Sequence, residues 1–167
     1  MPIIAIEGSN CSGKSTLIDY LAKYYDFKTS KSVPEWFRPY IPFARELPPQ
    51  IQRKIYEIGH IAAYNDAVKE KDYTIFDRYY FSTYIRLAYQ ETKSINECVD
   101  QIASFHYKPD LTIILIVPKE ITNSVSPYLL EQTMYPYESL EDVRDAIRNL
   151  DVLAIGMGWD YGEEHLS

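Results

Sequence analysis

Short apolar runs alternate along the chain with segments in which apolar residues recur every three or four positions. The first pattern indicates buried strands, and the second indicates helices that bury one face. The predicted strands cover residues 3–7, 28–33, 73–77, 111–117 and 152–157. The predicted helices cover residues 14–25, 49–71, 81–90, 94–106 and 139–150. This alternation predicts an α/β fold of three layers, with helices on both faces of a parallel sheet of about five strands.

Residues 34–49 interrupt the alternation, because they hold five of the ten prolines of the chain. Proline fixes one backbone torsion and lacks an N–H donor, so it fits poorly in a helix interior or a central strand. We therefore expect a loop over this segment. Long loops in compact domains are frequently functional.

The bulk composition fits one domain over residues 1–167, because 46% of these residues are hydrophobic and can form a core. The formal net charge of −7 disfavours a basic face for nucleic acid, although it leaves room for a local basic groove. No apolar stretch approaches the ~20 residues of a membrane helix, so no membrane association is expected. Cys11 and Cys98 lack metal-ligand spacing and favour a reducing, cytoplasmic setting.

One segment carries a complete phosphate-binding motif, G-x-x-x-x-G-K-[ST], between the first strand and the first helix. It consists of Gly8, Ser9, Asn10, Cys11, Ser12, Gly13, Lys14, Ser15 and Thr16. The glycines allow a tight turn whose N–H groups face phosphate oxygens, and the helix adds its positive N-terminal end. We expect Lys14 to reach the terminal phosphates and the Ser15 hydroxyl to bind Mg²⁺. The motif predicts a P-loop NTPase-type fold that binds ATP with Mg²⁺ as cofactor.

A second constellation follows the third predicted strand, which ends at Asp77 and is followed by Arg78. Ligands of parallel α/β sheets gather at the carboxyl ends of the strands, so Asp77 should lie near the phosphate loop. Its carboxylate is the expected Mg²⁺ partner of Ser15, and the Arg78 guanidinium suits phosphate oxygens. Asp77 and Arg78 could otherwise form an ordinary ion pair at the end of the strand.

Three stretches of sequence resemble thymidylate kinases, namely Phe76–Ser82, Ala88–Gln90 and Pro109–Pro118. A fourth stretch, Ile6–Gly8, resembles both thymidylate kinases and the related deoxynucleoside kinases. The resemblance implies a kinase in which Arg78 binds the phosphate of the acceptor. It also implies that the base or sugar of the acceptor lies along Ser82, Tyr89 and Gln90.

The segment after the second predicted strand resembles deoxynucleoside kinases in another respect. These enzymes present a glutamate there as base for the sugar 5′-hydroxyl, and Glu35 with Trp36 is similar. A phosphate acceptor needs no such base, so Glu35 separates nucleoside kinases from nucleotide kinases. Trp36, Arg38 and His60 are further candidates for the acceptor pocket. Each has a plainer alternative: Glu35 could hold Arg38, Trp36 could pack within the loop, and His60 could be a satisfied core residue.

Related kinases carry arginines in a lid after the fourth strand, but residues 119–143 contain none. We therefore expect a short or reduced lid around residues 119–138. The charge on the transferred phosphoryl group would then be met by Lys14, Mg²⁺ and Arg78. Arg86, Arg144 or a second subunit of a homodimer are further sources of positive charge.

The favoured function is transfer of the γ-phosphoryl group of ATP to a deoxynucleoside monophosphate, with Lys14, Glu35, Asp77 and Arg78 as candidate catalytic residues. Three alternatives remain open. The acceptor could be a deoxynucleoside, with Glu35 as the base, or a hydroxyl of a nucleic acid or modified base. The chain could also be a regulatory nucleotide-binding module without transfer activity.

Overall fold

The computed structural model describes residues 2–8, 12–92, 100–116 and 152–156. Five parallel strands form one sheet in the order β2-β3-β1-β4-β5. They are β1 (Ile3–Gly8), β2 (Lys28–Lys31), β3 (Thr74–Asp77), β4 (Leu111–Ile116) and β5 (Val152–Gly156). The helices are α1 (Lys14–Tyr25), the 3₁₀ helix η1 (Glu35–Tyr40), α2 (Ile41–Arg45), α3 (Pro49–Ala67) and α4 (Tyr80–Thr92). The predicted α/β class and parallel sheet are confirmed.

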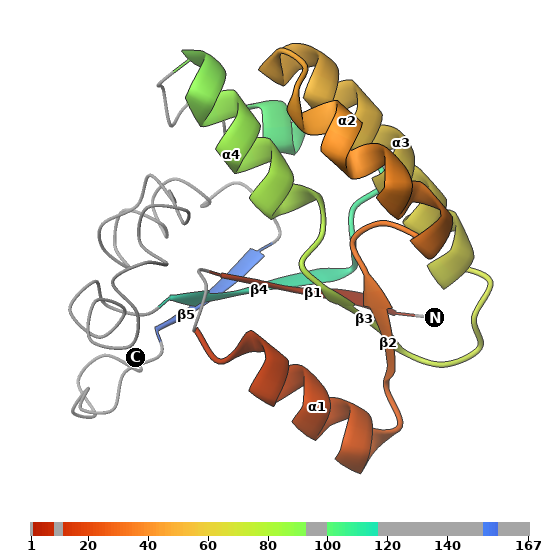
Figure 1. Cartoon of the computed structure of the whole chain (residues 1–167). Helices are drawn as coiled ribbons and strands as arrows, with labels where there is room; N and C mark the ends of the chain where they lie inside the picture. Colours follow the sequence, from red (N-terminus) through yellow and green to blue (C-terminus); the bar gives the residue numbers. More distant parts are fainter. Residues whose placement is uncertain (1, 9–11, 93–99, 117–151, 157–167) are drawn as a thin grey trace.

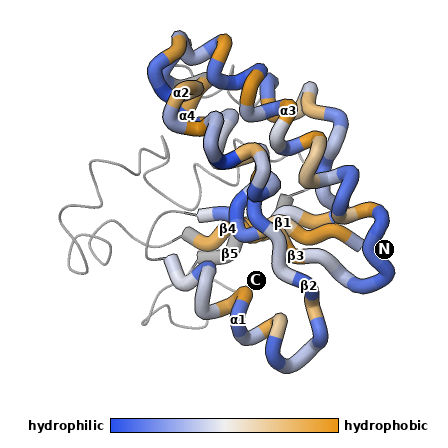
Figure 2. Tube along the Cα trace, turned by 45° about the vertical axis from the view of Figure 1, so that its right-hand side comes forward, coloured by the Kyte–Doolittle hydropathy of each residue, from blue (hydrophilic) through white to orange (hydrophobic). Residues whose placement is uncertain are grey.

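The sheet separates two helical layers (Figure 1). Helix α1 lies against one face, and α2, α3 and α4 lie over the other. Side chains along a strand alternate between faces, so β1 contributes Ile3 and Ala5 to the α3–α4 side and Ile6 to the α1 side. Figure 2 shows the resulting concentration of hydrophobic positions in the central strands. The three-layer arrangement is therefore the expected one.

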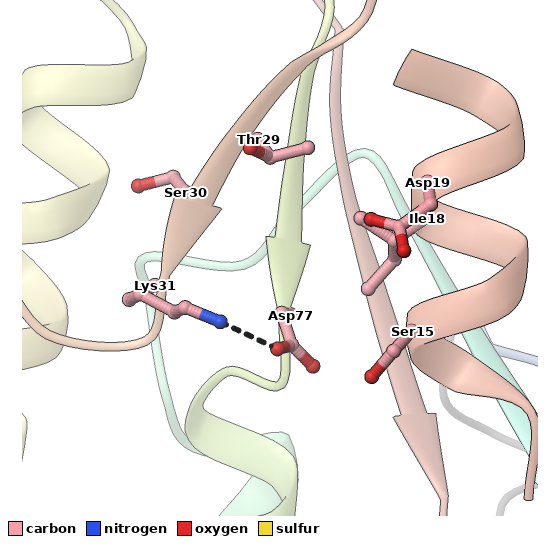
Figure 3. A pocket seen from close by; sticks show the side chains of 7 residues that line it. All are labelled: Ser15, Ile18, Asp19, Thr29, Ser30, Lys31 and Asp77. Atoms are coloured by element: carbon pink, nitrogen blue, oxygen red, sulfur yellow. Dashed lines mark hydrogen bonds and ion pairs between the residues drawn. The ribbon is translucent and has the colours of Figure 1, made fainter. Parts of the chain in front are cut away.

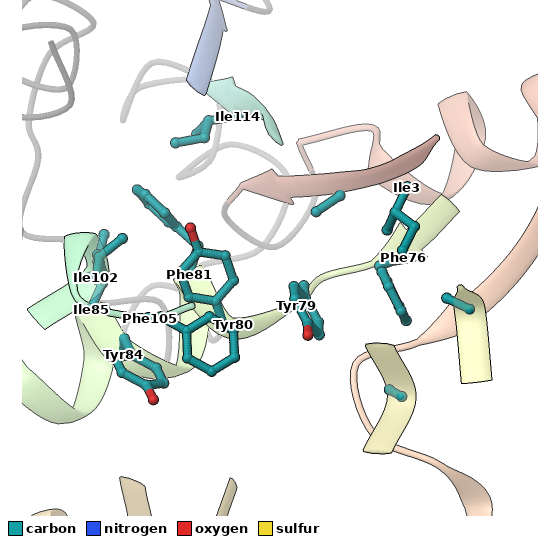
Figure 4. Close-up of a cluster of buried hydrophobic side chains, with 13 residues drawn as sticks. Ile3, Phe76, Tyr79, Tyr80, Phe81, Tyr84, Ile85, Ile102, Phe105 and Ile114 are labelled. Carbon is teal, nitrogen blue, oxygen red and sulfur yellow. The ribbon is translucent and has the colours of Figure 1, made fainter. Parts of the chain in front are cut away.

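The larger core lies between the sheet and α3–α4, and it is rich in aromatic rings (Figure 4). Tyr79, Tyr80 and Phe81 come from the start of α4 and its preceding turn, and each is at most 2% exposed. Tyr79 stacks on Phe76 and Tyr80 stacks on Phe105, each with ring centroids 4.6 Å apart. Such pairs stabilise a core beyond the burial of their area, so the segment after β3 is anchored firmly.

The expectation of a loop over residues 34–49 is wrong, because η1 and α2 occupy most of it. Pro42 lies at the start of α2, where a missing N–H costs no hydrogen bond. Pro39 is tolerated because η1 is a short 3₁₀ helix, which begins with the Phe37 N–H donating to the Pro34 carbonyl at 3.0 Å. Phe37 and Ala44 are buried against Tyr56 of α3, so hydrophobic contacts outweigh the weak helix propensity of the segment.

The other predicted boundaries shift by a few residues. Strand β2 ends at Lys31 rather than at residue 33, and α3 ends at Ala67 rather than at residue 71. Of the helix predicted over residues 94–106, the described part shows residues 100–103 as helical. The predicted helix 139–150 and the predicted lid 119–138 lie outside the described residues. Within the described part of the chain, no helix is long and apolar enough to cross a membrane.

Candidate active site

The phosphate-loop motif begins at the carboxyl end of β1, and its two glycines are required there. Gly8 has φ +140°, and a Cβ on it would lie 2.4 Å from the Leu115 carbonyl oxygen of the neighbouring strand. Gly13 has φ 84° and precedes the first turn of α1, whose Leu17 N–H donates to the Gly13 carbonyl at 3.0 Å. Both torsions favour glycine. The Ser9, Asn10 and Cys11 positions of the motif lie outside the described residues.

The α1 N-terminus and Lys14 are the positively charged groups of the phosphate-loop motif. No side chain among the described residues caps this helix end, and uncapped N–H groups there attract anions. The Lys14 side chain is buried, and its Nζ donates to Ser12 Oγ at 3.3 Å. The lysine is therefore held within the motif itself rather than extended into solvent.

Ser15 and Asp77 line one pocket at the carboxyl ends of the strands (Figure 3). The complete lining is Ser15, Ile18, Asp19, Thr29, Ser30, Lys31 and Asp77. The structure thus brings together the hydroxyl and the carboxylate that the sequence predicts as Mg²⁺ ligands. Hydroxyl and carboxylate oxygens are the donors that Mg²⁺ prefers. The described residues form no cluster of three or more His, Cys, Asp or Glu side chains, so the protein ligands at this pocket would be few.

Lys31 is a charged residue of this pocket that the sequence alone did not indicate. It is the direct register partner of Asp77, because β2 and β3 are neighbouring parallel strands. Its Nζ lies 2.8 Å from Asp77 Oδ2, as the dashed line in Figure 3 shows. The strand order brings these two side chains together, and no local sequence pattern gives that order.

Arg78 follows β3 in a left-handed conformation, with φ 61°. Its N–H donates to the Ile6 carbonyl of β1 at 3.0 Å, and its Nη1 donates to Ser82 Oγ at 3.3 Å. A left-handed torsion costs a non-glycine residue about 1 kcal/mol, so the surrounding hydrogen bonds must hold it.

Glu7 of β1 supplies much of that support through the residues that follow Arg78. It accepts hydrogen bonds from the Tyr79 N–H at 2.8 Å, from the Ser82 N–H at 3.4 Å and from the Ser82 hydroxyl. The side chain is completely buried, and this burial raises the pKa of its carboxyl, although the Ser82 and Tyr79 hydrogen bonds oppose the rise. A carboxylate inside an otherwise apolar strand is the signal that could have identified it.

The predicted acceptor residues on η1 are exposed. Glu35 is paired with Arg38 at 3.3 Å, and the Glu35 side chain is 80% exposed. Trp36 is 58% exposed and meets the edge of the Phe37 ring. The structure therefore shows the pair that was the plainer alternative for Glu35, in a position where either residue can reorient.

The predicted acceptor residues on the helices lie in varied surroundings. His60 is fully buried, with its Nδ1–H donating to the Ser32 carbonyl at 2.8 Å and its Nε2 without a partner. The Arg86 guanidinium lies 5.9 Å from the centre of the Tyr56 ring. Tyr89 and Gln90 belong to the last turns of α4. Their roles in the acceptor pocket remain predictions, as does that of Arg144, which lies outside the described residues.

Comparisons with known proteins agree with this geometry. The family described as an AAA domain matches residues 3–149. The chain is 30% identical over 135 residues to the probable thymidylate kinase 1 of Saccharolobus solfataricus, covering 73% of this chain and 68% of that protein. The thymidylate kinase of Ehrlichia chaffeensis superposes with a TM-score of 0.61 at 18% identity, covering 97% of this chain and 90% of that one.

The deoxyadenosine kinase of M. mycoides also shares the fold, with a TM-score of 0.55 at 19% identity over 93% of this chain and 89% of that one. P-loop kinases of this type use ATP, generally with Mg²⁺. A phosphate loop, a carboxylate at the end of β3 and these matches agree with one another. The chain therefore belongs to the thymidylate kinase-like and deoxynucleoside kinase superfamily of P-loop proteins, and it is a nucleoside or nucleotide kinase.

Proposed function

We propose that the protein transfers the γ-phosphoryl group of ATP to the phosphate of a deoxynucleoside monophosphate. The observation that carries this proposal is the meeting of Ser15 and Asp77 in one pocket, with Arg78 directly after Asp77. The first two residues suit the metal and the donor phosphates. Arg78 follows Asp77 directly in the chain, and its guanidinium suits the phosphate of an acceptor.

In this reaction the bond between the γ-phosphorus and the bridging oxygen of the β-phosphate breaks. A new bond forms between that phosphorus and an oxygen of the acceptor phosphate, and ADP leaves. Lys14 and the α1 N-terminus would bind the phosphates of ATP. Ser15 and Asp77 would hold Mg²⁺, which would offset the negative charge of those phosphates. Phosphoryl transfer depends mainly on such positioning and charge stabilisation, and the acceptor phosphate has no proton that a base must remove.

A deoxynucleoside is the second candidate acceptor, and the position of Glu35 favours it. Glu35 begins η1 four residues after β2 ends, and its carboxylate is accessible to a sugar hydroxyl. The proton of that hydroxyl would pass to Glu35 as the new phosphate ester forms. The present pairing with Arg38 would then have to open.

The deciding experiment incubates the protein with γ-labelled ATP and Mg²⁺ against deoxynucleosides, deoxynucleoside monophosphates and oligonucleotides with a free 5′-hydroxyl. We expect label in a nucleoside diphosphate, with thymidine monophosphate as the first substrate to test. Label in a monophosphate would instead support the nucleoside kinase, and label in the oligonucleotide would support the nucleic-acid acceptor. ATP binding without transfer to any acceptor would favour the regulatory module.

Glu35→Gln separates the first two functions, because it removes the base without changing the size of the side chain. A nucleotide kinase should retain its kcat in this variant, whereas a nucleoside kinase should lose about 10²-fold or more. Glu46→Gln is the matched control, since Glu46 is an exposed carboxylate that follows α2. A large loss in Glu35→Gln with monophosphate substrates would contradict the nucleotide kinase mechanism.

A further inference from the structure

Glu7 is the completely buried carboxylate next to the phosphate loop, and the transfer chemistry does not use it directly. Its position on β1 follows from the alternation of the strand, because Ile3, Ala5 and Glu7 all point to the α3–α4 side. Gly8, the next residue, opens the phosphate loop. Glu7 therefore lies between the part of the protein that holds ATP and the turn that carries Arg78.

The carboxylate of Glu7 meets three donors at the start of α4. The Tyr79 and Ser82 N–H groups both point to Oε1, and the Ser82 hydroxyl donates to Oε2. The first N–H groups of a helix have no partner within the helix. Glu7 therefore caps α4 from a strand more than seventy residues earlier in the chain, where the cap of a typical helix comes from an adjacent residue.

The same contacts reach Arg78 through Ser82. The Ser82 hydroxyl has a single proton, which it donates to Glu7, and its oxygen accepts from Arg78 Nη1 at 3.3 Å. The charge of Arg78 also acts favourably on the Glu7 carboxylate. Glu7 thus sets the direction of the hydrogen bond that holds the guanidinium.

We propose that Glu7 is a positioning residue that orients Arg78, through Ser82, toward the phosphate of the acceptor. This inference rests on the proposed function, in which Arg78 binds that phosphate. Glu7 connects the phosphate loop with Arg78, because it directly precedes Gly8 and is hydrogen-bonded to Ser82, which contacts Arg78. A shift of Gly8 would therefore be passed through Glu7 and Ser82 to Arg78. Selectivity for an acceptor that already carries a phosphate then depends on Glu7.

Glu7→Gln tests the inference with little change of volume. A glutamine has one oxygen and one amide nitrogen, so in either orientation its NH₂ group faces a donor that the carboxylate accepts. If the NH₂ group faces Ser82, it donates to the hydroxyl oxygen and takes one of the two lone pairs, and Glu7 no longer fixes the direction of the hydroxyl proton, so the hydrogen bond from Arg78 Nη1 is weakened. A lost hydrogen bond to a charged group corresponds to about tenfold or more in affinity.

The readout is the KM for thymidine monophosphate, together with the dissociation constant for a non-hydrolysable ATP analogue measured by calorimetry. In Glu7→Gln we expect the acceptor KM to rise by about tenfold, with the ATP-analogue affinity changed by less than about twofold. Ser82→Ala should raise the acceptor KM in the same direction. Asp110→Asn is the matched control, because Asp110 accepts the Ile3 N–H at 2.7 Å at the other end of β1.

A double-mutant cycle shows whether Glu7 acts through Arg78. In an Arg78→Ala background, Glu7→Gln should cause no further rise of the acceptor KM. Additive effects in the double variant, or equal losses of ATP and acceptor affinity in Glu7→Gln, would overturn the inference and leave Glu7 a purely structural residue.

A substrate-free measurement separates this outcome from a failure of the proposed function. The Nε–H signal of Arg78 in a nitrogen-15 NMR spectrum can be assigned by its loss in Arg78→Lys. In Glu7→Gln and in Ser82→Ala, the relaxation of this signal should report a more mobile Arg78 side chain. If Arg78→Ala left every acceptor KM unchanged, the proposed role of Arg78 would be wrong. If only Glu7→Gln were without effect on both the NMR signal and the KM, the inference on Glu7 alone would be wrong.

Discussion

Burial of His60 should make the stability of the protein depend on pH in a defined window. Its ring lies between Tyr56 and Tyr79, with centroid distances of 6.4 Å and 5.2 Å. Burial is the main cause that lowers the pKa of His60 from 6.5 to about 4, against the opposing hydrogen bond to Ser32. Protonation would place a charge and an unpaired N–H at Nε2, which has no partner.

The sign follows from comparing the folded and unfolded chains. Above pH 6.5, His60 is neutral in both states, and the folded protein has its full stability. As the pH falls from 6.5 to about 4, the unfolded chain takes up the proton first, so the free energy of unfolding decreases. At about 1.4 kcal/mol for each pKa unit, the decrease amounts to about 3 kcal/mol.

Urea unfolding followed by far-UV circular dichroism between pH 4 and pH 7 measures this contribution. Other groups also titrate in this range, so the quantity to compare is the difference in the free energy of unfolding between the wild type and His60→Gln at each pH. That difference should change by about 3 kcal/mol across the window in favour of the variant at low pH. His106→Gln, which replaces an exposed histidine, is the control. A wild-type minus His60→Gln difference that stays constant from pH 4 to pH 7 would refute the reasoning.

Three further predictions concern the site and its supports. Gly8→Ala places a Cβ 2.4 Å from the Leu115 carbonyl oxygen, so the free energy of unfolding in urea should fall by about 1–3 kcal/mol. Nucleotide binding measured by calorimetry should also weaken, and wild-type values for both quantities would contradict the role of Gly8. Gly59→Ala places its Cβ 2.7 Å from Val33 Cγ1, and we expect a loss of stability within the same range without a change in ATP affinity. Lys31→Met removes the cation that shares Asp77 with Mg²⁺, so the Mg²⁺ concentration for half-maximal activity should fall, while the stability should change by less than about 1 kcal/mol. An unchanged or higher Mg²⁺ requirement would show that Lys31 does not compete for Asp77.

Much of the fold could be predicted because its signals are local. The run Ile3–Ile6 and the spacing of Leu17, Ile18 and Leu21 specify β1 and α1 without reference to the rest of the chain. The meeting of Ser15 and Asp77 was also predictable, since parallel strands bring their carboxyl ends to one edge. These inferences need only periodicity and one rule of α/β topology.

The remaining features depend on contacts between distant segments. Lys31 lies next to Asp77 because β2 and β3 are neighbours in the sheet, and no short sequence pattern encodes that strand order. Glu7 finds its donors 72 and 75 residues away, so its role becomes visible only in the folded chain. The error over residues 34–49 has a similar origin, because burial of Phe37 against α3 stabilises helices that propensity alone disfavours.

The place of β2 at the margin of the sheet has a consequence for how copies of the protein meet one another. An edge strand offers unpaired backbone groups to any other extended chain, and long apolar edges promote aggregation. Strand β2 is only four residues long, it is mostly exposed, and it begins and ends with a lysine. Lys28 is held near Glu70 and Lys31 near Asp77, so a second β2 would approach with the same charges. We therefore expect Lys31, which lines the pocket, also to disfavour pairing of this edge with a second β2.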